Sequence, residues 1–222
     1  MNKPCELFAS VISDNPRDVF SNLRTYEDAK ISGIHFDMMD GNFVPRFGLY
    51  PEMLKEIRNL ISLPIEVHLM TSNFEKYLSQ ISELGANRII FHIEATDNLE
   101  NSIKKVKELG TEVGIAINPN TNLEFVGQIA NEIDYVMLMA ITPGIPKHPF
   151  IESTYKKIAD LKKILILNSS IAKIGIDGGV TFDNARDIYR IGADVLICGS
   201  GTFFDPTRSL KNNITLLQKT LS

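Results

Sequence analysis

The chain has 222 residues, a hydrophobic fraction of 44%, a charged fraction of 23% and a formal net charge of −4 at pH 7. These values are ordinary for a globular protein, and because the lysines and arginines are scattered we expect no nucleic-acid partner. The two cysteines, Cys5 and Cys198, lie too far apart for a zinc motif or a disulfide framework. The longest apolar run, residues 135–141, is too short to cross a bilayer, and the N-terminus lacks a full signal region. We therefore expect a cytoplasmic protein without a membrane partner.

In chain order, short apolar runs alternate with segments of helical period. The expected strands are residues 6–13, 34–39, 64–70, 88–94, 112–118, 135–141, 173–177 and 195–200. The expected helices lie near residues 16–30, 51–62, 73–85, 98–110, 121–132, 152–167, 182–191 and 207–220. Strict alternation predicts a parallel sheet with right-handed crossovers, and eight such units favour a single-domain (β/α)8 TIM barrel over residues 1–222. An open doubly wound sheet is the alternative, but fewer units are expected of it.

The stretch GIHFDMMDG at residues 33–41 carries His35 and Asp37 on one side of an apolar strand, where each costs desolvation energy. Similar polar residues recur near the C-terminal ends of the other strands, which a barrel brings to one mouth. They are Ser10, His68, His92, Glu94, Asn118, Asp177 and Ser200. Each alone could be a hydrogen-bonded core residue or part of a turn. Two histidines and two aspartates directed at one axis, however, need a shared partner, and a divalent cation binds both kinds of side chain.

Two glycine-rich turns follow the last two expected strands. IDGGVTFDN begins at the end of the seventh strand and ICGSGTFFDP at the end of the eighth. Each offers small residues before an expected helix start, so backbone N–H groups could approach an anion there. A phosphate site after these two strands is frequent in (β/α)8 barrels.

Taken together, these motifs resemble the ribulose-phosphate 3-epimerase family. The resemblance covers about residues 6–210 and rests on HFDMMDGNFVP (35–45), EVHLM (66–70), HIE (92–94), AINP (116–119), MAITPG (139–144), IDGGV (176–180) and CGS (198–200), in the family order. It implies an isomerase of carbohydrate metabolism, in the pentose phosphate pathway, that inverts C3 of a phosphorylated ketose. The first expected reaction converts D-ribulose 5-phosphate to D-xylulose 5-phosphate.

The resemblance also implies roles for individual residues. One divalent ion, Zn²⁺ or Fe²⁺, Mn²⁺ or Co²⁺, would be held by His35, Asp37, His68 and Asp177. Asp37 and Asp177 would also be the two acid–base groups, which transfer protons through a metal-stabilised enediolate. The implied substrate-contacting residues are Ser10, His68, Gly144, Gly178, Gly179, Gly199 and Ser200, and the implied methionines lining the reacting carbons are Met39, Met70 and Met139.

Two loops depart from the family pattern. Gly144 is followed by Ile145-Pro146-Lys147-His148-Pro149 instead of a Phe-Gly-Gly-Gln run, and FVPRFGLYP stands where FVPN and a Thr-Phe-Gly-Pro run are usual. Lys147 is predicted to contact the substrate phosphate, with a solvated lysine as the alternative. The substrate could be another ketose phosphate, such as allulose 6-phosphate, or the chain could be a catalytically degenerate sugar-phosphate-binding paralogue.

Two further expectations concern relatives and assembly. A hexulose-phosphate synthase or decarboxylase is disfavoured, because EVHLMTS lacks the Asp-x-Lys-x-x-Asp signature of those enzymes. Because the outer helices of such barrels commonly pair, we expect a homo-oligomer.

Overall fold

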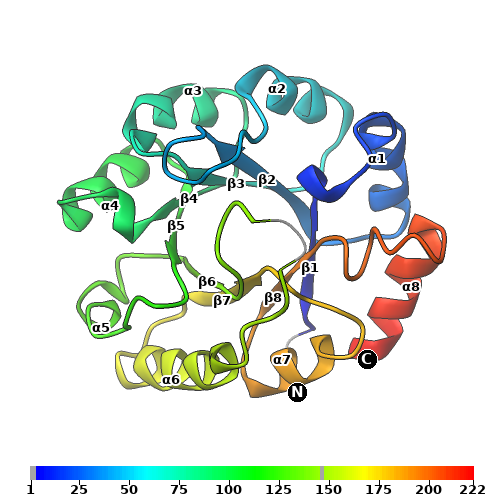
Figure 1. The fold of residues 1–222 in the computed structure, drawn as a ribbon. Coiled ribbons are helices and arrows are strands. Elements are labelled where there is room, and N and C mark those ends of the chain that lie inside the picture. The colour runs from blue at the N-terminus through cyan, green and yellow to red at the C-terminus, as the bar shows by residue number, and fades with distance from the viewer. Residues whose placement is uncertain (1–3, 146–147) are drawn as a thin grey trace.

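The computed structural model describes residues 4–145 and 148–222, and it shows eight parallel strands closed into a barrel inside a ring of helices (Figure 1). The strands are β1 (Glu6–Ser10), β2 (Gly33–Met39), β3 (Ile65–Met70), β4 (Arg88–His92), β5 (Glu112–Ile117), β6 (Tyr135–Met139), β7 (Lys173–Asp177) and β8 (Val195–Cys198). The helices are α1 (Val19–Asp28), α2 (Pro51–Leu60), α3 (Leu78–Glu83), α4 (Leu99–Glu108), α5 (Val126–Ile129), α6 (Ser153–Leu167), α7 (Ala185–Ile191) and α8 (Leu210–Leu221). The predicted closed barrel is confirmed, and the limits of the domain at residues 1 and 222 stay a prediction.

Alternation along the strands separates two apolar layers. Residues that face outward pack with the helices into the larger core, in which β-strand residues such as Phe36 meet helix residues such as Leu54. Residues that face inward fill the barrel, where Phe8, Ile90, Ala116, Tyr135, Met137, Met139, Val195 and Ile197 form a smaller cluster. The pairing of β2 with β3 sets His35 opposite Glu66 and Asp37 opposite His68. Since side chains two residues apart share a face, the inward side of β2 and β3 carries polar groups above the apolar filling.

Several elements are shorter than predicted. β1 ends at Ser10 and passes into a 3₁₀ turn at Val11–Ser13, and β4 ends at His92 before a 3₁₀ turn at Ile93–Ala95. The helix predicted at 121–132 is reduced to α5. In the loop before α5, Lys157 Nζ donates hydrogen bonds to the carbonyl oxygens of Asn118, Pro119 and Thr121 at 2.7, 3.1 and 2.6 Å. These carbonyl groups therefore have partners outside any helix.

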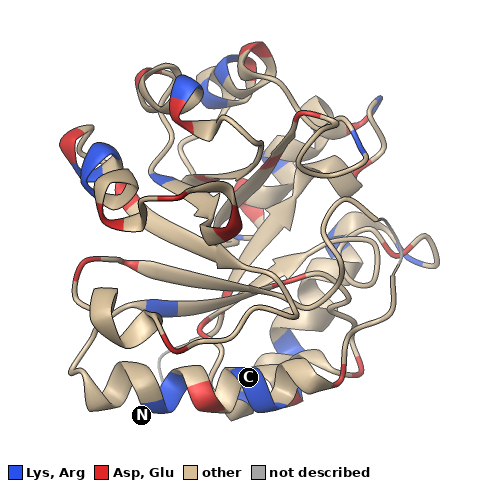
Figure 2. Cartoon of the chain, turned by 60° about the vertical axis from the view of Figure 1, so that its left-hand side comes forward, with Lys and Arg blue, Asp and Glu red and all other residues tan. Residues whose placement is uncertain are grey.

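Charged residues lie mainly on the helices and loops outside the barrel, with both signs interspersed (Figure 2). A second charged layer, which the sequence did not lead us to expect, lies inside the barrel on the N-terminal side of the predicted site. There Arg88 donates from Nη1 to Glu66 Oε2 at 2.6 Å, and its Nη2 lies 2.7 Å from Glu112 Oε2. The polar interruptions of the strands thus do not all gather at one mouth. Within the described residues, no helix is long and apolar enough to span a membrane.

Candidate active site

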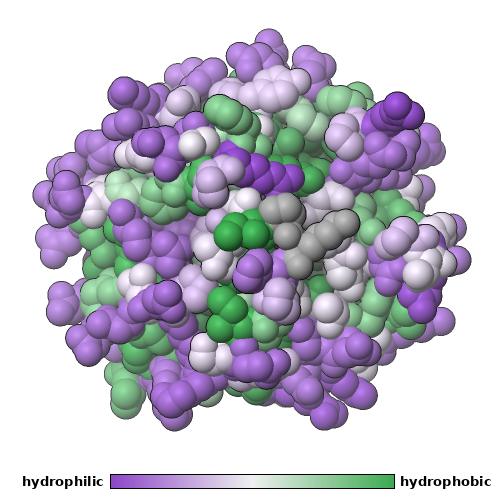
Figure 3. Space-filling model, in the orientation of Figure 1, coloured by the Kyte–Doolittle hydropathy of each residue, from purple (hydrophilic) through white to green (hydrophobic). Residues whose placement is uncertain are grey.

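A cavity of about 590 Å³ opens at the C-terminal ends of the strands. On this face a few apolar side chains lie near the centre among hydrophilic and intermediate ones, and hydrophilic side chains dominate the edge (Figure 3). The predicted residues that line the cavity are Ser10, Asp37, Met39, Met70, Met139, Gly144, Asp177, Gly178, Gly179, Gly199 and Ser200. The barrel therefore brings residues from β1, β2, β3, β6, β7 and β8, or from the turns that follow them, to one space.

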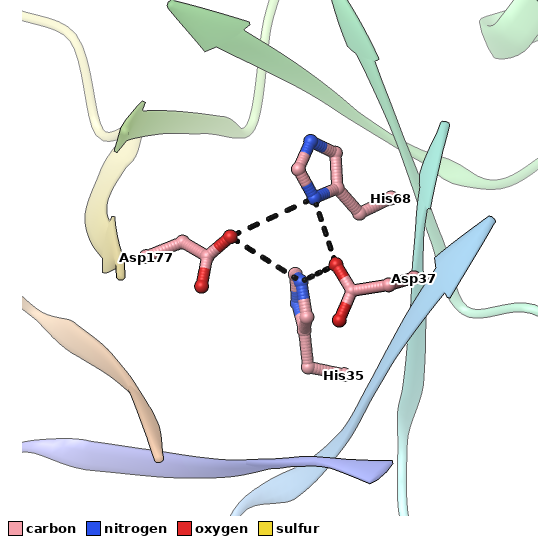
Figure 4. A group of neighbouring side chains, drawn as sticks. All are labelled: His35, Asp37, His68 and Asp177. Atoms are coloured by element: carbon pink, nitrogen blue, oxygen red, sulfur yellow. Dashed lines mark hydrogen bonds and ion pairs between the residues drawn. The ribbon is translucent and has the colours of Figure 1, made fainter. Parts of the chain in front are cut away.

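At the floor of the cavity, His35, Asp37, His68 and Asp177 converge (Figure 4). Each offers one ligand-type atom, and all four atoms lie within 4.8 Å of one another. Asp37 Oδ1 lies 3.1 Å from His35 Nε2 and 3.2 Å from His68 Nδ1. Asp177 Oδ2 lies 4.0 Å from His35 Nε2 and 3.8 Å from His68 Nδ1. Both carboxylates thus face the same two imidazole nitrogens.

The surroundings separate the pKa values of the two carboxyl groups. Burial alone would raise the pKa of Asp37, but the neighbouring imidazoles of His35 and His68 outweigh it and lower that pKa well below its usual range. Burial raises the pKa of Asp177 to about 7, and the carboxylates of Asp37 and Glu66 act in the same direction against the imidazole of His35. Asp37 is therefore ionised at neutral pH, whereas Asp177 titrates near it, and such separated pKa values suit paired acid–base groups.

The donor set fits a divalent cation. Two imidazole nitrogens and two carboxylate oxygens suit Zn²⁺, Fe²⁺, Mn²⁺ or Co²⁺, and a cation would offset the repulsion between buried carboxylates. His35 and His68 are fully buried and Asp37 is 4% exposed, so water competes little for these atoms. The cluster can therefore hold a metal ion.

The turn after β7 has a backbone that only glycine adopts easily. Gly178 and Gly179 have φ values of +96° and +66°, and a Cβ on Gly178 would lie 2.3 Å from Ile141 Cγ1. Asn184 fixes this turn, because its Oδ1 accepts from the Thr181 backbone N–H at 2.8 Å and its Nδ2 donates to the Gly179 carbonyl oxygen at 2.9 Å. A rigid turn of bare backbone therefore borders the cavity, as expected of an anion cradle.

The turn after β8 is closed by backbone hydrogen bonds. The backbone N–H groups of Thr202 and Phe204 both donate to the Gly199 carbonyl oxygen. The next helix, α8, begins at Leu210, close to the predicted start near residue 207. Gly199 and Ser200 border the cavity.

The remaining predicted residues occupy different positions. Ser10 Oγ donates to Asp37 Oδ2 at 3.1 Å, so it reaches the cluster directly. His68, also predicted as a substrate contact, is fully buried and does not line the cavity. The predicted phosphate contact of Lys147 falls outside the described residues.

Two residues near the site were not predicted from the sequence. Glu66 lies two positions before His68 on the inward side of β3, and its Oε1 lies 2.6 Å from His35 Nδ1. Glu66 could have been found from the sequence, because it lies two residues from His68 and so shares the inward face of the strand. Arg46 lines the cavity from the loop after β2, and its side chain has no hydrogen-bond or ion-pair partner among the described residues.

The fold and the site together define a class: (β/α)8-barrel proteins with a metal-type cluster of two histidines and two aspartates at the C-terminal mouth. A family profile described as the ribulose-phosphate 3 epimerase family matches residues 6–203, and the chain belongs to this family. It is therefore an enzyme of the isomerase class, an epimerase.

Individual relatives bear the same description. The ribulose-phosphate 3-epimerase of Aquifex aeolicus is 39% identical over 170 residues, which cover 77% of each chain. The enzyme of that name from Buchnera aphidicola of Schizaphis graminum is 35% identical over 198 residues, covering 89% of this chain and 87% of the relative. That of Escherichia coli K12 is 32% identical over 174 residues, covering 78% and 77%.

Solved structures share the architecture at low sequence identity. KGPDC from Streptococcus mutans gives a TM-score of 0.72 at 11% identity, with 99% of this chain and 98% of that chain covered. Phosphoribosyl anthranilate isomerase from Thermus thermophilus gives 0.68 at 14% identity, with 97% and 98% covered. These likenesses bear on the fold alone.

Proposed function

We propose that this chain is a metal-dependent epimerase that inverts C3 of a phosphorylated ketose, converting D-ribulose 5-phosphate to D-xylulose 5-phosphate. The observation that carries the proposal is the pair Asp37 and Asp177, which face the same two imidazoles at the floor of one cavity. The name ribulose-phosphate 3-epimerase, borne by the relatives, supports the choice of substrate.

Inversion beside a ketone requires that a proton leave one face of the carbon and another arrive at the opposite face. Asp37, ionised, removes the proton in one direction of the reaction, and Asp177, with its pKa raised to about 7, delivers a proton from β7. The reverse direction starts from the opposite protonation states. A divalent cation held by His35, Asp37, His68 and Asp177 would supply Lewis-acid stabilisation of the charge that develops on the substrate oxygens.

The rest of the cavity orients the substrate. Backbone N–H groups of the turns at Gly178, Gly179 and Ser200 bind the phosphate, which sets the chain direction of the ketose. Met39, Met70 and Met139 line the cavity beside the two carboxylates and give the reacting carbon an apolar surface that excludes water. C3 is thereby held between the two acid–base groups.

The test is incubation of the metal-loaded protein with a panel of ketose phosphates in D₂O, followed by NMR. We expect deuterium at C3 and formation of the second epimer, with ribulose 5-phosphate turned over most efficiently. Metal analysis of the same sample should give one divalent ion per chain. A chain that binds the sugar phosphates without exchange at C3 would instead be the catalytically degenerate paralogue.

One observation favours another ketose phosphate as a second candidate substrate. Arg46 adds a guanidinium to the cavity, in the loop that departs from the family pattern, and it has no hydrogen-bond or ion-pair partner within residues 4–145 and 148–222. A guanidinium binds phosphate or several hydroxyl oxygens in fixed directions, so it can select a longer sugar. Arg46→Ala, with the exposed Arg24→Ala on α1 as the matched control, should lower kcat/KM most for the true substrate of the panel. An equal effect on all substrates contradicts a selective role.

Two other expectations stay predictions: assembly as a homo-oligomer and a cytoplasmic location.

A further inference from the structure

Each imidazole of the cluster uses a different nitrogen to face the carboxylates. His35 presents Nε2 and turns Nδ1 toward Glu66 Oε1, 2.6 Å away. His68 presents Nδ1 and turns Nε2 toward His92 Nε2, 2.9 Å away. A nitrogen can coordinate a cation only if it carries no proton, so the partners on the far side of each ring decide whether the cluster is ready to bind.

Behind His35, the partner is a carboxylate that can only accept. Glu66 is 1% exposed, and its second oxygen accepts from Arg88 Nη1 at 2.6 Å. Arg88 is held in turn by Glu112, to which its Nε donates at 2.9 Å, and it lies 4.2 Å above the ring centroid of Tyr135. Arg88 only donates, so the ionised Glu66 presents one acceptor oxygen to Arg88 and the other to His35. Asp37 Oδ1, also an acceptor, lies 3.1 Å from His35 Nε2. With a cation in place of a proton at Nε2, the remaining proton of His35 is therefore held at Nδ1.

Behind His68, two residues act in series. His92 is fully buried, and its Nδ1 lies 3.3 Å from Glu94 Oε2. The other oxygen of Glu94 accepts from the Asn118 backbone N–H at 2.9 Å and from Thr121 Oγ1 at 2.5 Å. A carboxylate at this position accepts from His92 Nδ1–H, which leaves His92 Nε2 as an acceptor. Since one of two facing nitrogens must donate, His68 carries its proton at Nε2 and leaves Nδ1 bare.

We propose that Glu66, and the His92–Glu94 pair, are positioning residues that set the tautomers of His35 and His68 so that both face the carboxylates with an unprotonated nitrogen. The inference rests on the proposed cation site and assigns to it three residues that touch neither substrate nor metal. It also explains why a carboxylate is buried within the barrel directly behind a metal-type histidine.

Glutamine substitutions reverse each tautomer while keeping the side-chain volume. In Glu66→Gln, the amide oxygen must face Arg88, so the amide NH₂ faces His35 Nδ1 and moves the ring proton to Nε2. In Glu94→Gln, the amide oxygen stays with the Asn118 N–H, so the NH₂ faces His92 and drives the proton of His68 to Nδ1. Both changes place a proton where the cation would bind, and loss of such outer partners typically weakens metal affinity about 10–100-fold.

Matched controls keep the same neighbourhood and leave the tautomers alone. Glu112→Gln alters the far side of Arg88 without contact to His35. Thr121→Val removes one donor to Glu94 but keeps the carboxylate beside His92. If Glu66 and Glu94 only fill space, the variants and their controls should behave alike.

The experiment measures zinc affinity by chelator competition, with long-range ¹H–¹⁵N NMR of the zinc-loaded wild-type protein, whose four histidines give few signals. We expect protons at His35 Nδ1, His68 Nε2 and His92 Nδ1, a zinc affinity about 10–100-fold weaker in both glutamine variants, and near-native affinity in both controls. Any other proton pattern in the wild type overturns the inference even if a variant fails to fold. Wild-type zinc binding with equally tight glutamine variants overturns the inference alone, whereas a wild type that binds no divalent cation overturns the proposed function as well.

Discussion

Replacing Asp177 by asparagine separates the two halves of the proposed proton transfer. Asparagine keeps nearly the same volume and an oxygen that can face His35 Nε2 and His68 Nδ1, which lie 4.0 and 3.8 Å from Asp177 Oδ2. It can neither give nor take a proton at C3. The fold should therefore persist, and at a saturating concentration of the cation inversion should still be lost.

The size of the loss follows from the position of the group. A positioned acid or base contributes about 10²–10⁴-fold, and each tenfold step corresponds to about 1.4 kcal/mol in the barrier. With a pKa raised to about 7, Asp177 titrates close to neutral pH, where acid–base catalysis is most effective. We therefore expect the upper half of that range, a fall in kcat of about 10³–10⁴-fold, or ~4–5.5 kcal/mol.

The assay follows turnover and deuterium incorporation from each epimer separately. Asp177→Asn should still exchange the C3 proton of the epimer presented to Asp37, without inversion, and Asp37→Asn should exchange only the other epimer. Asp183→Asn, an exposed carboxylate in the following turn, is the matched control and should turn over at the wild-type rate. A metal-loaded Asp177→Asn protein with more than about a tenth of wild-type turnover, or two variants that exchange the same epimer, would refute the two-base reasoning.

Three further predictions follow from other parts of the structure. Gly178→Ala forces a Cβ to within 2.3 Å of Ile141 Cγ1 at a φ of +96°, so we expect a loss of about 1–3 kcal/mol in unfolding free energy and a raised KM for the ketose phosphate, measured by thermal unfolding and kinetics. Tyr135→Phe removes a buried hydroxyl without a hydrogen-bond partner among the described residues, so denaturant unfolding should show a change below about 1 kcal/mol; a loss above about 2 kcal/mol would reveal a partner. Removal of divalent ions with a chelator should abolish turnover, and a divalent ion added back should restore it; full activity in a metal-free sample would contradict the cation site.

The barrel could be predicted from the sequence because its signals are local. Eight apolar runs, each followed by helical periodicity, required no knowledge of distant contacts. The convergence of His35, His68 and Asp177 followed from the same logic, since parallel strands deliver their C-terminal ends to one mouth. The loops were harder to predict, because their contacts are distant in sequence: Lys157 on α6 binds the carbonyl groups of Asn118, Pro119 and Thr121 in the loop before α5.

The support behind the cluster could not be predicted for a different reason. Alternation shows that Glu66 shares a face with His68, but it does not show that Glu66 meets His35 or Arg88 on the neighbouring strands. These contacts depend on the register of strand pairing, which sets His35 opposite Glu66 and Glu66 opposite Arg88. The tautomers in turn depend on hydrogen bonds formed only after the barrel has closed.

Closure of the barrel also determines when the cluster can exist during folding. His35, Asp37 and His68 lie on β2 and β3, whereas Asp177 comes from β7, more than a hundred residues later in the chain. A fragment ending after β4 holds three of the four groups and lacks the carboxylate that completes the site. A cation bound by all four joins the two halves of the chain, and at a concentration of 100 times its Kd such a ligand stabilises the closed form by about 2.7 kcal/mol. Reassembly of two separately produced half-barrels should therefore depend on the divalent ion, because its ligands come from both halves.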